Sequence, residues 1–358
     1  MILKHLLIAV GILSLAGCAG ETEQVNQVPT LSGETPIIIA HRGASGERPE
    51  HTLAAYTLAI EQGADFIEPD LVLTKDGVLV ARHENEISET TDVADRSEFT
   101  DRKTIKTIDG REFTGWFTED FTLAELKTLR AKERLPELRE ANMKFDGQFE
   151  IPTFEEILQL IKAHQEETGK RIGVYPETKH PSYFTSIDLP HQKPLLALLT
   201  EYGFDGADDP VFIQSFEVGN LKKLNDATQV RLVQLMAEEY DPSDLDDRSY
   251  ADMATAEGLT EIAEYADGVG PSKNMVISRN AVGQLDGDTG FVEAAHKAGL
   301  AVHPWTFRRE NYFLPTEYKS GIDPRDHGDL EGEIRAFIAA GVDGLFSDNP
   351  AQAAGLVK

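Results

Sequence analysis

The sequence is poor in cysteine and in positive charge. Its 358 residues include one cysteine, Cys18, which excludes an internal disulfide and a metal centre built from cysteine ligands. There are 34 lysines and arginines against 62 aspartates and glutamates, which gives a net charge of −28. Because nucleic acids and anionic lipid surfaces are bound mainly through basic patches, we expect neither as a partner. A site for an anionic small molecule must therefore bring its own positive charge, from a metal ion, an arginine or helix N-termini.

The apolar run near the amino terminus is too short to cross a bilayer. A short basic segment precedes apolar residues 6–15 and small residues follow them, which is the layout of a secretory signal. Residues 15–18, Leu-Ala-Gly-Cys, resemble the bacterial lipobox, in which the cysteine becomes the lipidated first residue of the mature protein. We therefore expect residues 1–18 to be a lipoprotein signal peptide. Membrane contact only through a lipid on Cys18 would place the protein in the bacterial periplasm or at the outer membrane. A free cysteine beside a secreted-type signal is the alternative.

Beyond the signal, the chain divides into a tether and a repeating α/β pattern. Residues 19–35 are polar and lack periodicity, which is typical of a flexible tether. From residue 36 onward, short β-rich runs alternate with helical stretches, as in a parallel sheet built of βα units. The predicted strands are 37–40, 65–70, 171–177, 211–215, 230–235, 267–271, 300–305 and 343–347. The predicted helices include 52–62, 153–168, 193–202, 216–225, 257–265, 289–298 and 330–340.

The alternation favours a TIM (β/α)8 barrel over residues 36–358. An open, doubly wound sheet has the same local pattern, but the glycine-rich dinucleotide loop that typically follows its first strand is absent. Residues 84–150 are polar and densely charged, so we expect a small insertion after strand two. Its aromatic residues are expected to pack as a small satellite core, with a lid over the site as the alternative. These residues are Phe99, Phe113, Trp116, Phe117 and Phe121.

Polar residues gather at the carboxyl ends of the predicted strands, where barrels of this type carry their active sites. They are His41 and Arg42 after strand one, Glu68 and Asp70 in strand two, Glu177 and Lys179 at strand three, Gln214 at strand four, His303 and Trp305 at strand seven, and Asp348 at strand eight. Taken singly, Asp348 is better explained as the N-cap of the following helix. The set as a whole predicts one site with complementary charges.

The segment after strand two predicts which of these residues meet. Asp76-Gly77 is a strong signal for a two-residue hairpin turn. That turn would place Asp70 directly opposite His83, with Cβ atoms about 4.5–5.5 Å apart, and Glu68 on the same face. A longer loop would shift the pairing by one residue. We therefore expect one cluster of His41, Arg42, Glu68, Asp70 and His83.

This cluster has the residue types of metal-assisted phosphoryl transfer. Carboxylates without cysteine suit a hard cation such as Ca²⁺ or Mg²⁺. Two histidines flanking the acids can serve as general acid and base, and Arg42 can hold a phosphate. For either histidine alone a structural role would be favoured, whereas the pair flanking the acids favours a catalytic one. For His51, which precedes a helix, structural and functional roles both remain open.

Residues 41–84 resemble the signature of the glycerophosphodiester phosphodiesterases, especially their larger periplasmic branch. Matching segments follow in order at 90–96, 175–181, 214–216, 233–235, 265–271, 302–308 and 344–350. The resemblance implies a TIM barrel with a small insertion after strand two. It also implies hydrolysis of glycerophosphodiesters to glycerol 3-phosphate and an alcohol, with one divalent cation, for which we favour Ca²⁺ over Mg²⁺.

The resemblance also assigns roles by matching position. His41 and His83 correspond to the acid/base pair, Arg42 to the phosphate ligand, and Glu68, Asp70 and Glu177 to the metal ligands. Lys179 matches the lysine that follows the third acid. From its place at the end of strand seven, and not from the resemblance, Trp305 is expected to contact the glycerol or alcohol moiety, with packing at the barrel rim as the alternative. Glu84 departs from the aspartate that is commoner in the family signature, and we expect the longer acid to matter little.

Two other functions stay open at this point. A related barrel phosphodiesterase acting on intact phospholipids would share the site but expose apolar residues around its mouth. A non-catalytic, phosphodiester-binding lipoprotein would be expected to lack one of the two histidines.

Overall fold

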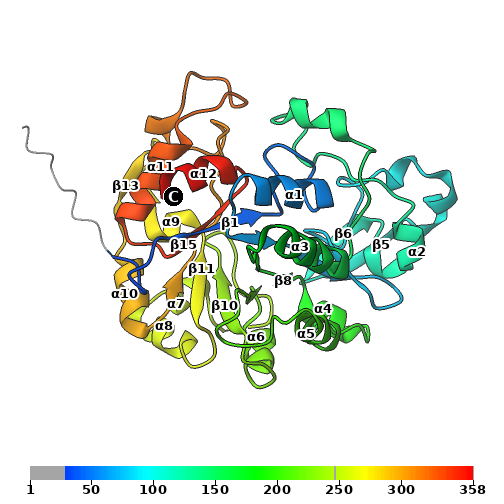
Figure 1. The fold of residues 1–358 in the computed structure, drawn as a ribbon, viewed down its shortest axis with the longest axis horizontal. Coiled ribbons are helices and arrows are strands. Elements are labelled where there is room, and N and C mark those ends of the chain that lie inside the picture. Colours follow the sequence, from blue (N-terminus) through cyan, green and yellow to red (C-terminus); the bar gives the residue numbers. More distant parts are fainter. Residues whose placement is uncertain (1–28, 246, 358) are drawn as a thin grey trace, which may run out of the picture.

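The strands of the computed structural model close into a parallel barrel (Figure 1). The model describes residues 29–245 and 247–357, so the predicted signal peptide and Cys18 lie outside the described residues. In chain order the barrel strands are β1 (Ile37–His41), β2 (Phe66–Glu68) with β3 (Asp70–Leu73), β7 (Gly173–Val174) with β8 (Glu177–Thr178), β9 (Phe212–Ser215), β10 (Arg231–Met236), β11 (Gly268–Pro271), β14 (Ala301–Val302) and β15 (Gly344–Ser347). Each predicted strand is confirmed.

Two interruptions divide the barrel into sheets with the orders β15-β1-β2-β7 and β14-β11-β10-β9-β8-β3-β4. Pro69 separates β2 from β3, and Pro176 lies between β7 and β8; neither proline has an N–H to donate to a ladder. The carbonyl of Pro69 still accepts from the Glu177 N–H at 2.9 Å, which joins strands two and three across the break. The barrel closes where the Asp343 N–H donates to the Val302 carbonyl at 2.9 Å. Closure excludes the open-sheet alternative.

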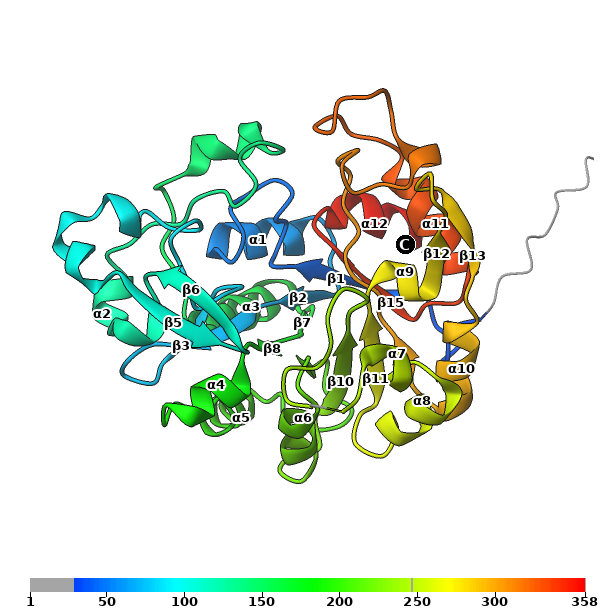
Figure 2. The same cartoon turned by 180° about the vertical axis from the view of Figure 1, so that it is seen from behind.

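Helices surround this barrel, as the two opposite views show (Figures 1 and 2). The predicted ones are present as α1 (Leu53–Glu61), α3 (Phe154–Thr168), α5 (Gln192–Glu201), α6 (Val218–Asn225), α8 (Ala256–Ile262), α10 (Phe291–Ala298) and α11 (Leu330–Ala339). The longest of these, α3, begins at a capping box between Thr153 and Glu156 and ends at Gly169 in the left-handed conformation, the start and stop chemistry typical of helices. In the described part of the chain, no helix combines the length and apolar character that a membrane crossing requires.

Short elements in the connections were not predicted. They are α2 (Leu123–Leu126), α4 (Pro181–Ser186), α7 (Tyr250–Met253), α9 (Lys273–Val276) and α12 (Pro350–Val357), with the hairpins β5 (Thr104–Ile108)–β6 (Arg111–Gly115) and β12 (Ile277–Arg279)–β13 (Leu285–Asp288). Several of these helices span a single turn, too short to show a helical period in the sequence.

Two apolar clusters form the core. Inside the barrel lie Ile39, Phe66, Tyr175, Phe212, Val233 and Phe346. A larger cluster lies between the strands and the helices, and it takes in Phe99, Trp116 and Phe121 from the insertion together with Val72 and Val80. Three of the five insertion aromatics are thus continuous with the main core instead of forming a separate satellite, and Phe117 is also fully buried. Phe113 lies apart from them, against the main cavity.

The hairpin of β3 with β4 (Leu79–Ala81) differs from the predicted one by one residue. Leu73 pairs with Leu79 and Leu71 with Ala81, and the Thr74 N–H donates to the Val78 carbonyl at 3.0 Å. The loop therefore has three residues and ends at Gly77, whose φ is 76°, as in hairpins with a left-handed third residue. The predicted two-residue turn is wrong, and the residue opposite Asp70 is Arg82, not His83.

Candidate active site

The predicted site residues line one cavity of about 510 Å³ at the carboxyl ends of the barrel strands. Its walls include His41, Arg42, Glu68, His83, Glu177, Lys179, Gln214 and Trp305. Asp70 lies behind this wall, 1% exposed. The corrected hairpin register does not remove His83 from the site, because His83 lies beyond the end of β4 at Ala81 and lines the cavity.

Three buried carboxylates form a compact group at the centre. One oxygen from each of Glu68, Asp70 and Glu177 lies within 4.8 Å of the others. Burial and the neighbouring Asp70 raise the pKa of Glu68 well above its usual range and that of Glu177 to about 8. Burial would also raise the pKa of Asp70, but Arg42 and His51 hold it well below the ordinary value. Asp70 Oδ1 is buried without a hydrogen-bond partner. Crowded carboxylates with an unused oxygen fit a hard divalent cation.

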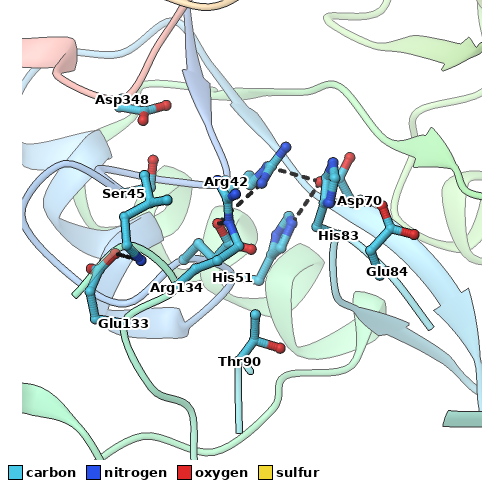
Figure 3. Close-up of polar contacts among 12 residues, drawn as sticks. Arg42, Ser45, His51, Asp70, His83, Glu84, Thr90, Glu133, Arg134 and Asp348 are labelled. Carbon is cyan, nitrogen blue, oxygen red and sulfur yellow. Dashed lines mark hydrogen bonds and ion pairs between the residues drawn. The ribbon is translucent and has the colours of Figure 1, made fainter. Parts of the chain in front are cut away.

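Arg42 is held between acids at the end of β1. Its Nε lies 3.1 Å from Asp70 Oδ2 and its Nη1 3.1 Å from Glu50 Oε2, while its backbone N–H donates to Glu68 Oε2 at 2.8 Å. The residue has a φ of 62°, a left-handed conformation that costs about 1–3 kcal/mol and is common at functional sites. Figure 3 shows its side chain and that of His51 directed toward Asp70. The guanidinium is thus fixed beside the carboxylates.

His51, whose role the sequence left open, supports the acidic group. It is fully buried, with Nε2 2.9 Å from Asp70 Oδ2 and Nδ1 2.7 Å from the Tyr56 hydroxyl. A partner of this kind fixes the orientation of a carboxylate that could bind a metal.

His41 is paired with Asp348. Its Nδ1 lies 2.6 Å from Asp348 Oδ1, and the other oxygen of Asp348 accepts from Arg139 Nη2 at 2.6 Å and Arg308 Nε at 2.8 Å. Burial and the nearby Arg42 lower the pKa of His41 to about 3, so the ring is neutral, its Nδ1–H donates to Asp348 and its Nε2 is the free nitrogen. The expectation that Asp348 caps a helix is therefore replaced by a contact with His41.

His83 has an equivalent partner in the next residue. Its Nδ1 lies 3.0 Å from Glu84 Oε1. Burial, Arg42 and Lys179 lower its pKa to about 4, so this ring is also neutral near pH 7. Both histidines thus have Nδ1 held by a carboxylate, which leaves Nε2 for proton transfer.

The remaining predicted residues have fixed positions as well. Lys179 Nζ lies 3.0 Å from Glu177 Oε1, Gln214 Nε2 donates to Glu68 Oε1 at 3.1 Å, and the Trp305 indole N–H donates to the Gly270 carbonyl at 2.8 Å. His303 lies outside the cavity wall, where its Nδ1 contacts the Tyr175 hydroxyl at 2.8 Å inside the barrel. It is a buried structural histidine.

Sequence reasoning did not find the residues that hold the histidines. Asp348 was visible at the end of strand eight, but its link to His41 joins residues 307 positions apart. Arg139 comes from the insertion, where nothing in the local sequence distinguishes it from other arginines. Glu84 was noticed only as a departure from the commoner aspartate.

Comparison with known proteins agrees with this geometry. The model of the glycerophosphoryl diester phosphodiesterase family matches residues 41–352. A glycerophosphodiester phosphodiesterase of Arabidopsis thaliana is 35% identical over 356 residues, covering 94% of this chain and 91% of that protein. One from Haemophilus influenzae is 33% identical over 329 residues, covering 85% and 86%.

Solved structures show the same fold. One from Silicibacter pomeroyi matches with a TM-score of 0.63 at 20% identity, covering 93% of this chain and 95% of that one. A phosphodiesterase from Oleispira antarctica, solved with the product sn-glycerol-3-phosphate, matches with a TM-score of 0.58 at 20% identity, covering 91% and 98%. The predicted family and the TIM-barrel fold are both confirmed, and the chain belongs to the glycerophosphoryl diester phosphodiesterase family.

Proposed function

We propose that this enzyme cleaves glycerophosphodiesters into sn-glycerol 3-phosphate and an alcohol, with one divalent cation and with His41 and His83 as the acid/base pair. The observation that carries the proposal is the arrangement of two neutral histidines, each held at Nδ1 by a carboxylate, on a cavity that adjoins three clustered acids. The Oleispira antarctica relative, with sn-glycerol-3-phosphate as its product, supports the substrate class.

Glu68, Asp70 and Glu177 are the residues that would hold the cation. A bound divalent cation would neutralise their charge and polarise the phosphoryl oxygens of the substrate. Three carboxylates with room for further oxygen ligands suit Ca²⁺, which takes about six to eight oxygens, better than Mg²⁺, which prefers to keep its waters.

The two histidines supply the proton transfers. One accepts, at Nε2, the proton of the attacking oxygen, and the other gives a proton to the departing alkoxide as the P–O bond to the alcohol breaks. The attacking oxygen belongs to water or to the glycerol 2-hydroxyl, which is already held beside phosphorus. In the second case a cyclic glycerol phosphate forms first and water then opens it. An anionic phosphate beside a histidine raises its pKa, which lets one of the pair carry the proton that it donates.

Three further residues complete the proposed site. Arg42 and Lys179 provide the positive charge that an anionic diester needs in a protein of net charge −28. Trp305 lies on the cavity wall, where it would contact the glycerol or alcohol moiety.

Water-soluble diesters are proposed in preference to intact phospholipids. Half-buried Phe113, Phe216 and Trp305 line the cavity, but among large apolar side chains that are exposed in the described chain, Tyr240 is the one that lines it. A site for intact lipids would be expected to surround its mouth with a larger apolar patch.

The test is a coupled assay of sn-glycerol 3-phosphate release by the purified protein. With Ca²⁺ present, we expect release from both glycerophosphocholine and glycerophosphoethanolamine, and a chelator should abolish it. Unchanged release in the chelator would refute the metal requirement, and no release from either diester would refute the proposed substrate class.

We also propose that residues 1–18 are removed as a lipoprotein signal and that Cys18 carries the lipid, which would place the enzyme in the periplasm or at the outer membrane. The lipobox-like Leu-Ala-Gly-Cys at 15–18 supports this. Mass spectrometry of the mature protein should find a diacylglycerol on Cys18. An unmodified amino terminus at another residue would contradict the proposal.

A further inference from the structure

A continuous chain of contacts leads from His83 to the tip of the insertion hairpin. Glu84 Oε1 lies 3.0 Å from His83 Nδ1, and Glu84 Oε2 lies 2.8 Å from His180 Nε2. The other nitrogen of His180, Nδ1, lies 2.5 Å from Asp109 Oδ2. Four side chains from three separate segments are thus joined end to end beside the cavity.

The far end of this chain is fixed by the shape of the hairpin. Asp109 and Gly110 form the turn between β5 and β6, with φ values of 48° and 77°, as expected for an Asp-Gly hairpin turn. The tip lies at the cavity, because Asp109, Arg111 and Phe113 line its wall.

The charge states of His180 and Glu84 agree with this chain of contacts. Burial alone would lower the pKa of His180, but its bonds to Asp109 and Glu84 raise it to about 9 against the opposing charge of Lys179. His180 is therefore a cation near pH 7 and donates from both nitrogens. Burial would raise the pKa of Glu84, but His83 and His180 hold it well below its usual range. The Glu84 carboxylate accepts from His180 Nε2 and lies 3.0 Å from His83 Nδ1.

The length of Glu84 matters to this arrangement. An aspartate at this position would be one methylene shorter. The glutamate carboxylate reaches two imidazoles, one with each oxygen. Because a carboxylate with two fixed donors has little rotational freedom, it also fixes the ring that it accepts from.

We propose that His180 and Asp109 are positioning residues for His83, acting through Glu84, so that the docked hairpin tip holds the His83 ring with Nε2 toward the substrate. This inference rests on the proposed role of His83 and adds to it a dependence on the insertion. The insertion is thereby part of the catalytic geometry as well as a wall of the cavity.

The test compares steady-state kinetics on glycerophosphocholine for variants of the chain of contacts. Asp109→Asn and His180→Asn should each lower kcat by about tenfold while KM changes less than about twofold. Asparagine tolerates the left-handed backbone of His180, whose φ is 47°, so the substitution removes the cation without adding backbone strain. The double variant of Asp109→Asn and His180→Asn should be no slower than His180→Asn alone, because both substitutions break the same chain of contacts.

Two further variants act as internal comparisons. Glu84→Asp keeps an acid beside His83 but shortens its reach, so it should behave like His180→Asn. Glu84→Gln removes the charge at full length and should cost about 10–100-fold in kcat. Glu112→Gln is the matched control, because Glu112 lies on the same hairpin and is exposed; its kinetics should equal those of the wild type.

The outcomes separate this inference from the proposed function. The slow variants should share the leaving-group dependence of His83→Ala and differ from that of His41→Ala. If His83→Ala is nearly inactive while Asp109→Asn and His180→Asn keep the wild-type kcat, the positioning inference is wrong and the proposed function stands. A raised KM at unchanged kcat would also refute it, because the hairpin would then only contact substrate. If His83→Ala itself keeps normal activity, the proposed catalytic role of His83 is wrong, and the positioning inference that rests on it is wrong too.

Discussion

His41 and His83 share an environment that makes both of them proton acceptors at rest. Burial and the charge of Arg42 lower their pKa values to about 3 and about 4, and a carboxylate holds Nδ1 of each ring. Burial alone would not decide which ring nitrogen carries the proton. The carboxylates at Nδ1 restrict rotation of each ring and fix the tautomer.

His41→Ala and His83→Ala should each lower kcat on glycerophosphocholine by about 10²–10⁴, the usual contribution of a general acid or base. Circular dichroism should show native folding for both variants. A variant with near-normal turnover would show that its histidine is structural.

His180 gives a prediction about stability and pH. Its pKa in the folded protein is raised from 6.5 to about 9, so its ion pairs stabilise the fold fully below pH 6.5 and lose their effect as the pH rises through 9. The loss should amount to no more than about 3 kcal/mol. Urea unfolding of wild type and His180→Asn at pH 6 and pH 9.5 would measure it. The difference in unfolding free energy between the two proteins should shrink at the higher pH, and a constant difference would contradict the assignment.

At the scale of elements, the turn between β1 and α1 positions the site. Gly43 has a φ of 84°, and a Cβ added there would lie 2.6 Å from the carbonyl carbon of Ala55 in α1. The close approach of turn and helix therefore requires glycine. It also fixes the neighbouring Arg42, whose backbone N–H donates to Glu68.

Gly43→Ala should therefore destabilise the protein by at least about 2 kcal/mol and lower its activity, because strain and overpacking add. Gly299→Ala is the matched control. Gly299 has a φ of 85° but no atom within 4 Å of the added Cβ, so it should cost only about 1 kcal/mol and leave kcat unchanged. Equal effects of the two substitutions in thermal unfolding would show that crowding against α1 is unimportant.

The elements also show what the sequence could and could not predict. The barrel strands follow from apolar runs with short periodicity, and α3 from its capping residues, because both signals are local. The predicted register of β3 with β4 was wrong by one residue, because Asp-Gly occurs in three-residue as well as two-residue hairpin loops. The contact of Asp109 with His180 joins residues 71 positions apart, so only the folded chain reveals it.

At the scale of the whole molecule, a strongly acidic protein carries a small site that concentrates both signs of charge. The sequence predicted the acids, the arginine and both histidines, because each lies at or near a strand end and matches a family motif. It could not predict Arg139 as a partner of the site, since its role depends on where the insertion docks. Asp348 was expected at the site, but its pairing with His41 was not predicted. The overall negative charge gives no attraction for an anionic diester, which makes the local cations necessary.

The acidic group predicts a cation-dependent stability. Adding Ca²⁺ to the metal-free protein at about 100 times its dissociation constant should raise the unfolding free energy by about 2.7 kcal/mol. Glu177→Gln, which keeps the shape but removes one ligand charge, should show a much smaller increase in differential scanning calorimetry. A Ca²⁺ effect of equal size in both proteins would place the bound ion elsewhere.

The most direct test of the proposed acid/base mechanism is how the activity of the two histidine variants depends on the leaving group. Both should be nearly inactive on glycerophosphocholine, whose alkoxide needs a proton to depart. A glycerophosphodiester with an activated phenolate needs no such acid, so it should restore activity to the variant that lacks the acid and leave the variant that lacks the base inactive. If His41→Ala and His83→Ala respond alike on both substrates, the proposed division between acid and base is wrong.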